Sequence, residues 1–318
     1  MHTRFRQSMM VSLFVIAAVV SRANAAYPEK PIEIVVPWPP GTSTDAAARA
    51  VAQAMSKRLG VPMPVVNKPG AQGVVGTAEL ARGRADGYTV GVTNIGPVVA
   101  QVIGGNAPYK SADLEPVGLF MAAPFLIVAR GDAPFRTYKE LADHAKNKEV
   151  RFGNFGPGAV PTNSVIALAR KHGWQYRSVT FPNLGLPQLQ SGDAEIITVE
   201  YSAIASALKG GQARAIAQIQ PSRHSALPDV PTVRELGLDV DVSLWGGLFV
   251  PRGTPVDIVQ RLGQALREAL ADPAVREFSS KSGIAMDYVD ARRSAQQIRD
   301  DESWLRPTME ALGLIKKQ

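Results

Sequence analysis

Two hydrophobic patterns alternate along the chain. Short runs of β-branched and other apolar residues predict strands at residues 32–36, 88–93, 117–129, 150–154, 195–199, 213–219 and 243–250. Between the first two runs, Val51, Met55 and Leu59 recur at helical spacing, and Gly60 then supplies a stop. Strands that alternate with amphipathic helices are typical of α/β layers, not of a β-sandwich or a helical bundle.

Further helices are predicted by their start signals. Thr137 and Glu140 have the spacing of a capping box, and Thr254 with Pro255 opens a helix whose leucines share one face. These helices run from residue 137 onward and over residues 162–170, 202–208 and 254–270. The chain has no internal repeat and no low-complexity linker. A crossing between two lobes must therefore use a strand-like segment, and the long run at 117–129 is the best candidate.

The first 25 residues have the three regions of a secretory leader. Arg4 and Arg6 precede an apolar run at residues 9–20, and Ala23-Asn24-Ala25 forms a small-x-small cleavage signal. We therefore expect residues 1–25 to be a cleaved signal peptide and the mature, exported protein to begin at Ala26. The apolar run is shorter than the ~20 residues that a membrane helix needs. An uncleaved N-terminal anchor is the alternative.

Composition excludes several classes of function. The 318-residue chain is 45% hydrophobic, which suffices for the packed cores of two domains. Cysteine is absent, so thiol catalysis and zinc sites with Cys ligands are excluded. The formal net charge is +7, but Lys and Arg are interspersed with acids, so no basic stripe indicates nucleic-acid binding. A mild positive field favours an anionic ligand.

A polar turn at residues 37–45 lies between a predicted strand and a predicted helix. Thr42, Ser43 and Thr44 bring three hydroxyls to the helix start, and Asp45 follows them. Backbone N–H groups at a helix start are unpaired and the dipole there is positive, so a carboxylate would bind. Alternatively, Thr42 or Ser43 only caps the helix and Asp45 only complements its dipole.

Two more turns of this kind follow. Residues 67–76 carry glycines at every third position, but their spacing matches neither a dinucleotide fold nor a phosphate loop. The glycines favour an anion-accepting nest or simple tight turns about equally. Residues 154–163 again end at a predicted helix start. Two such helix starts, facing each other from different lobes, would bind the two ends of a dianion.

Six short motifs, in order along the chain, resemble the signature of a known family. They are residues 27–37 (YPEKPI, then IVVP), 41–45 (GTSTD), 67–71 (NKPGA), 86–89 (DGYT), 227–232 (LPDVPT) and 251–255 (PRGTP). Together they resemble the Bug family, the periplasmic solute-binding proteins of tripartite tricarboxylate transporters. The match covers essentially the whole mature chain.

The resemblance implies an α/β, two-lobed periplasmic binding protein of the Venus-flytrap, type II-like kind, in which helices flank a mixed sheet in each lobe. Residues 26–122 and 245–318 would form lobe 1, and residues 123–244 lobe 2. Such a receptor is a periplasmic monomer without a cofactor, and it delivers a small carboxylate to membrane permease subunits. The ligand site that the resemblance implies comprises Trp38, Gly41, Thr42, Ser43, Thr44, Asp45, Gln72, Gly73, Asn94, Asn154, Phe155, Gly156, Val160, Pro161, Thr162, Phe181, Pro182 and Asn183.

The chain also departs from the family pattern. Thr42 replaces the second glycine of the first loop, and Asn154 and Thr162 stand where the second-lobe loop usually starts with Ser and ends with His. The segment Phe181-Pro182-Asn183 replaces a Tyr-Lys-Gly segment. The first lobe therefore keeps the family anchor, and the second is expected to set which carboxylate is accepted.

Aromatic residues near these turns indicate which kind of carboxylate would bind. Trp38, Phe155, Phe181 and Trp245 would form an aromatic rim suited to a flat aromatic carboxylate or dicarboxylate, although aromatic residues more often pack in a core. An aliphatic di- or tricarboxylate is the other expectation. A ligand-dependent signalling partner of a membrane sensor would use the same fold.

A periplasmic hydrolase or lyase is the competing class. Outside the leader, His144, His172 and His224 lie in no metal-spacing motif, and no GxSxG elbow is present. Asp239 and Asp241 alternate along an extended segment, but nothing in the pattern indicates a raised pKa. We therefore expect a binding protein and not an enzyme.

Overall fold

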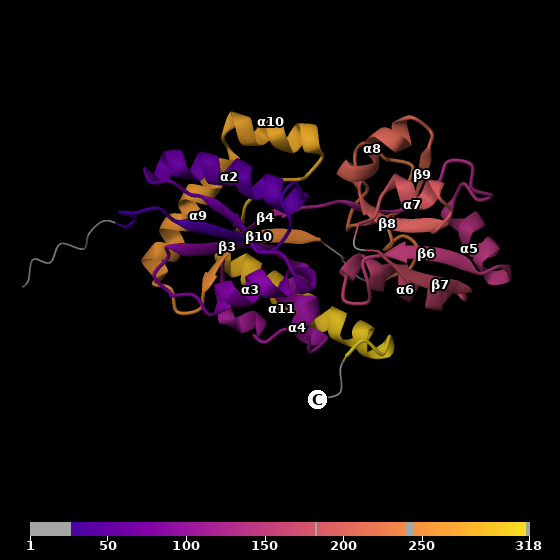
Figure 1. Ribbon diagram of the computed structural model, residues 1–318, viewed down its shortest axis with the longest axis horizontal. Helices are drawn as coiled ribbons and strands as arrows, with labels where there is room; N and C mark the ends of the chain where they lie inside the picture. The colour runs from indigo at the N-terminus through magenta and orange to yellow at the C-terminus, as the bar shows by residue number, and fades with distance from the viewer. Residues whose placement is uncertain (1–26, 182, 239–243, 316–318) are drawn as a thin grey trace, which may run out of the picture.

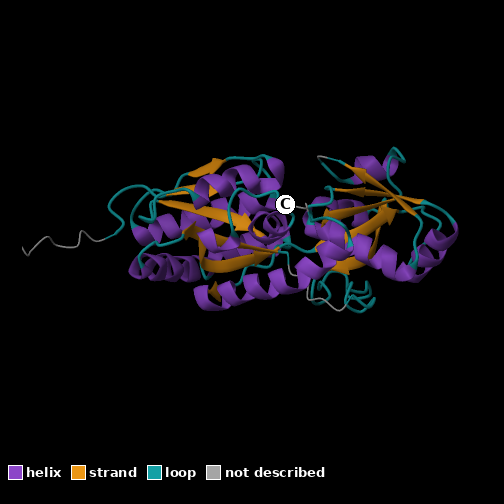
Figure 2. Ribbon diagram, turned by 90° about the horizontal axis from the view of Figure 1, so that it is seen from below, coloured by secondary structure: helices purple, strands orange, loops and turns teal. Residues whose placement is uncertain are grey.

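Two mixed sheets organise the chain, and helices flank each of them (Figures 1 and 2). The computed structural model describes residues 27–181, 183–238 and 244–315. The predictions for the leader, Pro182, Asp239 and Asp241 lie outside the described residues. Among the described residues, no helix combines the length and the apolar character that crossing a membrane requires.

The first sheet has six strands in the order β11-β4-β10-β3-β1-β2, and we call the part built on it the first lobe. Strands β1 (Glu33–Val36), β2 (Val65–Asn67) and β3 (Thr89–Asn94) are parallel to one another, whereas β10 (Trp245–Pro251) runs antiparallel to β3 and β4 (Leu114–Ala122), and β11 (Val289–Asp290) antiparallel to β4. Its helices are α2 (Ser43–Leu59), α3 (Val74–Ala81), α4 (Gln101–Ile103), α9 (Val256–Leu270), α10 (Pro273–Ser282) and α11 (Ala291–Ala311), with short turns η1 (Ala71–Gly73), η2 (Gly96–Ala100) and η3 (Ser111–Asp113). The predicted apolar face of α2 is buried against this sheet.

The second sheet has five strands in the order β7-β6-β8-β5-β9, and the part built on it is the second lobe. Strand β5 (Phe125–Arg130) runs antiparallel to β8 (Ile196–Glu200) and β9 (Ala213–Ile219), while β6 (Val150–Asn154) is parallel to β8 and β7 (Tyr176–Thr180). Its helices are α5 (Tyr138–Asn147), α6 (Val160–His172), α7 (Leu186–Gln190) and α8 (Tyr201–Lys209). The expectation of a mixed sheet flanked by helices in each lobe is confirmed.

The run at residues 117–129 is two strands, not the single strand that its hydrophobicity predicts. Strand β4 ends at Ala122, and β5 begins at Phe125 in the other sheet. Pro124 lacks the N–H group that a ladder needs, and it disfavours continued regular structure in the residue before it. The chain therefore passes from the first sheet to the second at Ala123 and Pro124, inside the run where a crossing was expected.

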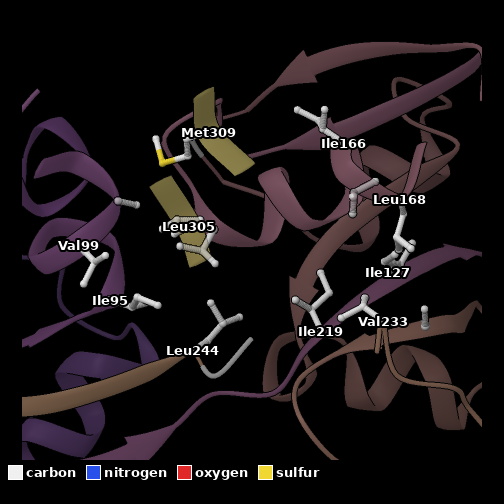
Figure 3. Packing of buried hydrophobic residues seen from close by; sticks show 14 of the residues in the cluster. Ile95, Val99, Ile127, Ile166, Leu168, Ile219, Val233, Leu244, Leu305 and Met309 are labelled. Atoms are coloured by element: carbon white, nitrogen blue, oxygen red, sulfur yellow. The ribbon is translucent and has the colours of Figure 1, made fainter. Parts of the chain in front are cut away.

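Helix α11 adds a connection between the lobes that the hydrophobic pattern did not predict. Leu305 and Met309 of α11 are buried in one cluster with residues of both lobes, among them Ile95 and Ile166 (Figure 3). Arg170 at the end of α6 also donates from Nη2 to the Leu312 carbonyl at 3.3 Å. The two lobes are therefore joined by packing as well as by the chain.

Candidate ligand site between the two lobes

A cavity of about 1030 Å³ lies between the two lobes. The first lobe contributes the loops before α2 and α3, and the second lobe contributes the loop before α6 and the start of α8. Strand ends and helix starts of both sheets therefore meet at one space. This arrangement is common for ligand sites in α/β folds.

Thr42 is the cap of helix α2. Its side chain accepts a hydrogen bond from the Asp45 backbone N–H at 3.4 Å, which satisfies one of the free donors at the helix start. The backbone explains why Thr replaces a glycine here, because Thr42 has a φ of −70°, whereas the preceding Gly41 has a φ of +85°. The capping alternative thus holds for Thr42, which also lines the cavity.

Asp45, which the site implied by the resemblance includes, is buried beside the cavity wall and hydrogen-bonded within the first lobe. Its carboxylate accepts hydrogen bonds from Gly41 N at 2.9 Å, from Asn67 Nδ2 at 2.8 Å and from Arg49 Nε at 3.0 Å. Burial opposes ionisation, but these donors lower the pKa of Asp45 overall. Asp45 is 3% exposed and does not line the cavity, so it fixes the loop that carries the hydroxyls.

Ser43 contacts an acid that the sequence reasoning missed. Its hydroxyl donates to Oε2 of Glu200, which ends strand β8 in the other lobe. Burial raises the pKa of Glu200, although the hydrogen bond from Ser43 opposes that shift. In the sequence, Glu200 lies between the end of a predicted strand and the start of a predicted helix. The three polar turns have the same placement.

Gln72 and Gln101 connect the first lobe to the loop before α6. Gln72 Nε2 donates to the Phe155 carbonyl at 3.1 Å, and Gln101 Nε2 donates to the Gly158 carbonyl at 3.0 Å and to Gln72 Oε1 at 2.6 Å. Gln72 adopts a left-handed conformation with φ +54°, which costs free energy in a non-glycine residue. We call Gln72 and Gln101 the glutamine clasp. Gln101 was not predicted, because it lies in the helical segment after β3 that carries no start signal.

The loop before α6 positions fewer side chains in the cavity than expected. Asn154 is fully buried, its Oδ1 accepts from Gly156 N at 2.8 Å, and its Nδ2 donates to Ser178 Oγ at 2.7 Å. Thr162 is also fully buried, and its hydroxyl has no hydrogen-bond partner among the described residues. Asn154, Gly156 and Thr162 do not line the cavity. The hydrogen bond between Asn154 and Gly156 shapes the turn, and Thr162 is buried in the first turn of α6.

Thirteen predicted site residues do line the cavity, whereas ligand contact by any of them stays a prediction. They are Trp38, Gly41, Thr42, Ser43, Thr44, Gln72, Gly73, Asn94, Phe155, Val160, Pro161, Phe181 and Asn183. Helix α6 begins at Val160 without a side-chain cap. Val160 and Pro161 of its first turn line the same cavity as Ser43 at the start of α2.

Aromatic side chains line much of the cavity. Phe125 and Phe155 pack edge to face, with ring centroids 6.2 Å apart. Trp245 is fixed from behind, since its Nε1 donates to the buried Asp301 of α11 at 2.6 Å. Among the described lining residues, Glu200 is the one ionisable side chain, and no Lys, Arg or His is present. The described lining of the cavity is thus aromatic and amide-rich, and it has no cationic side chain.

The histidines lie apart from the cavity. His144 packs against Phe135 inside the second lobe, and His224 stacks on Tyr201 with ring centroids 4.5 Å apart. His172 contacts the Leu236 carbonyl through Nε2 at 3.1 Å. None of the three lines the cavity, so these side chains do not form a catalytic constellation there.

The model of the tripartite tricarboxylate transporter family receptor matches residues 47–314. The UPF0065 protein in the TAR-I ttuE-ttuC′ intergenic region of Agrobacterium vitis is 34% identical over 270 residues, which is 83% of this chain and 78% of that relative. The structure of periplasmic binding protein BugD is 29% identical, has a TM-score of 0.79 and covers 92% of this chain and 100% of its own. MatC from Rhodopseudomonas palustris, with bound malate, is 30% identical, has a TM-score of 0.77 and covers 89% of this chain and 99% of its own.

These similarities extend over nearly the whole described chain and include both lobes. They confirm the α/β, two-lobed fold and the resemblance to the Bug family that the sequence motifs predicted. The chain belongs to the tripartite tricarboxylate transporter receptor family.

Proposed function

We propose that this protein is a periplasmic receptor that closes its two lobes over a small carboxylate and delivers it to membrane permease subunits of the tripartite tricarboxylate type. The observation that carries the proposal is the meeting of two helix starts, those of α2 and α6, at one cavity between the lobes. Free N–H groups and the positive dipole ends favour a carboxylate there without a cationic side chain. The malate bound to the related MatC supports this class of ligand.

The proposal includes export and the lobe boundaries. Residues 1–25 would be removed as a signal peptide, and the mature monomer would consist of lobe 1 (26–122 and 245–318) and lobe 2 (123–244). The sheet change at Ala123 supports the first boundary. Mass spectrometry of periplasmic protein should find an N-terminus near Ala26. An intact N-terminus on membrane-bound protein would contradict export in this form.

The aromatic lining supports a ligand with a flat or apolar body. Phe125, Phe155, Phe181 and Trp38 would cover such a body, while Thr44, which also lines the cavity, would donate to its carboxylate. Ligand binding favours closure of the two lobes if the ligand contacts both of them. A ligand shifts an equilibrium between open and closed forms only by its differential affinity for the two forms. The glutamine clasp shows that these lobes make contact across the cavity.

A thermal-shift panel followed by calorimetry tests the function. Aliphatic and aromatic mono-, di- and tricarboxylates are the probes, with neutral sugars and amides as controls. A specific ligand at 100 times its dissociation constant should add about 2.7 kcal/mol to the free energy of unfolding. Binding of sugars but of no carboxylate would refute the proposal.

A further inference from the structure

We propose that Glu200 is the specificity-determining residue of the cavity, and that it selects a carboxylate which also carries a hydrogen-bond donor, an ammonium group above all, against a dicarboxylate. This inference rests on the proposed function and narrows its ligand class. It differs from the expectation, drawn from the two helix starts, of a dianion held at both ends. It also places the choice of ligand on a residue outside the three polar turns.

The charge of the side chains that line the cavity favours a ligand with one carboxylate. Apart from Glu200, the hydrogen-bonding side chains among the described lining residues are neutral, such as Ser43, Gln72 and Asn183, and none is a cation. Helix starts and amides suffice for one carboxylate. A second carboxylate would instead enter a cavity in which Glu200, the one ionisable side chain among the described lining residues, is itself acidic. Like charges at short range are unfavourable, and the aromatic walls reduce their screening.

The position of Glu200 favours a ligand that carries a hydrogen-bond donor. The residue ends β8 and immediately precedes α8, and its side chain reaches across to Ser43 in the first turn of α2. It accepts the Ser43 hydrogen bond through Oε2, while Oε1 accepts none from the described residues. A carboxyl oxygen without a protein donor, at a ligand cavity, favours a donor on the ligand.

The state of the carboxyl group agrees with this role. Burial raises the pKa of Glu200, and the one hydrogen bond from Ser43 offsets only part of the cost of burying its ionised form. An ammonium or amide N–H of the ligand would supply that compensation as a charge-assisted hydrogen bond. A second ligand carboxylate would compete with Glu200 for the Ser43 hydroxyl and would supply no donor when ionised.

The variant Glu200→Gln distinguishes a role of Glu200 in ligand recognition from a role in bridging the two lobes. Glutamine keeps an oxygen that accepts from Ser43, so the contact between the lobes remains, but the negative charge is lost. Glu195→Gln is the matched control, because Glu195 lies just before β8, interacts with Arg151 and is absent from the cavity lining. Both variants change the charge of the same lobe by the same amount. Glu200→Ala is a second variant that also removes the acceptor.

The experiment is calorimetry with two matched probe series on purified full-length mature protein. One series is succinate, succinamate and 4-aminobutyrate, and the other is benzene-1,4-dicarboxylate, 4-carbamoylbenzoate and 4-(aminomethyl)benzoate. In at least one series, wild-type protein should bind the amine or amide at least about tenfold more tightly than the dicarboxylate. Glu200→Gln and Glu200→Ala should reduce this ratio at least about tenfold, whereas Glu195→Gln should keep it within about twofold.

Three results would overturn the inference. A wild-type preference for the dicarboxylate contradicts it directly, as does a ratio that survives both Glu200 variants while carboxylates still bind. In those cases the proposed function stands and only the role of Glu200 fails. If no carboxylate of either series or of the wider panel binds to any variant, the proposed function itself fails, and the inference fails with it.

Discussion

Two carboxyl groups near the start of α2 show how position decides the role of a residue. Asp45 receives three hydrogen bonds, from Gly41, Asn67 and Arg49, and its pKa is lowered although burial opposes this. Glu200 receives one hydrogen bond, from Ser43, and burial raises its pKa. The well-satisfied group holds the loop, and the poorly satisfied one faces the ligand cavity.

Asp45→Asn should destabilise the fold. The asparagine amide keeps one acceptor oxygen, but its NH₂ group would face N–H donors that now bond to the second carboxylate oxygen. A hydrogen bond to a charged group contributes about 1.5 to 3 kcal/mol. Urea unfolding should therefore show a loss of about 2 to 3 kcal/mol. The exposed Asp143→Asn is the control and should change stability little. If stability is unchanged and ligand affinity is altered, Asp45 acts in ligand binding and not in holding the fold.

Glu200→Gln should make the protein progressively more stable than wild type as the pH rises above about 4.5. The raised pKa means that the native state binds this proton more tightly than the unfolded state does. Wild-type stability is therefore lost as the pH rises from the ordinary glutamate value toward the native one, and glutamine removes that loss. Urea unfolding from pH 4.5 to 8 measures it, with Glu195→Gln as the control. Parallel profiles for wild type and Glu200→Gln would contradict the assignment.

At the level of elements, the glutamine clasp of the first lobe and the loop before α6 fit closely together. A Cβ on Gly158 would lie 2.3 Å from Gln101 Nε2, and one on Gly156 would lie 3.1 Å from Gln72 Nε2. Glycine at these positions lets the loop backbone approach the amides closely. The glycine-rich composition of residues 154–158 is thus explained by contact between lobes, in addition to turn geometry.

Gln101→Ala should weaken ligand binding about tenfold. The change removes the hydrogen bond to Gly158 and the support of Gln72, and neutral hydrogen bonds contribute about 0.5 to 1.5 kcal/mol each. Because the bond to Gly158 exists only when the lobes meet, its loss favours the open form. Calorimetry measures the affinity, and small-angle scattering should show a larger radius of gyration without ligand.

Asn106→Ala is the matched control for the clasp. Asn106 donates to Gln101 Oε1 at 3.1 Å within the first lobe, so its loss leaves the contacts between the lobes in place. The affinity of this variant should stay close to that of wild type. Equal affinities and equal radii for Gln101→Ala and wild type would show that the clasp does not contribute to closure.

At the scale of the whole molecule, helix α11 couples the two lobes. It packs against β4 in the first lobe and α6 in the second, and Leu305 is fully buried in the cluster that includes both (Figure 3). The same helix supplies Asp301, which holds Trp245 at the cavity wall. The C-terminal helix is therefore part of the core and supports the site.

Leu305→Ala should cost about 2 to 5 kcal/mol of stability, as is usual when a leucine is removed from a packed core. The effect should reach both lobes, because the cluster contains residues of each. Hydrogen exchange should show lower protection in β4 and in α6 together. The exposed Val256→Ala is the control and should change stability by less than about 0.5 kcal/mol. Loss of protection in one lobe alone would contradict the coupling.

Local pattern was sufficient for the fold class and for the elements that carry the strongest periodicity. The apolar face of α2, the strands at the cores of both sheets and the polar turns between strand and helix follow from spacing that acts over a few residues. The predicted strands at 150–154 and 213–219 coincide with β6 and β9, and the boundaries of the other core strands differ by one or two residues. The single strand at 117–129 was wrong, because hydrophobicity does not distinguish one long strand from two that enter different sheets.

Which side chains of the polar turns face the cavity was decided by tertiary packing. Asp45 and Thr162 have the residue types and the placement of ligand contacts, yet both point into the protein because neighbouring elements surround them. Glu200 contacts Ser43, which lies 157 residues earlier in the sequence. Periodicity reports only the near neighbours of a residue, so the pairing of two sheet ends, and with it the chemistry of the cavity, exists only once the lobes are packed together.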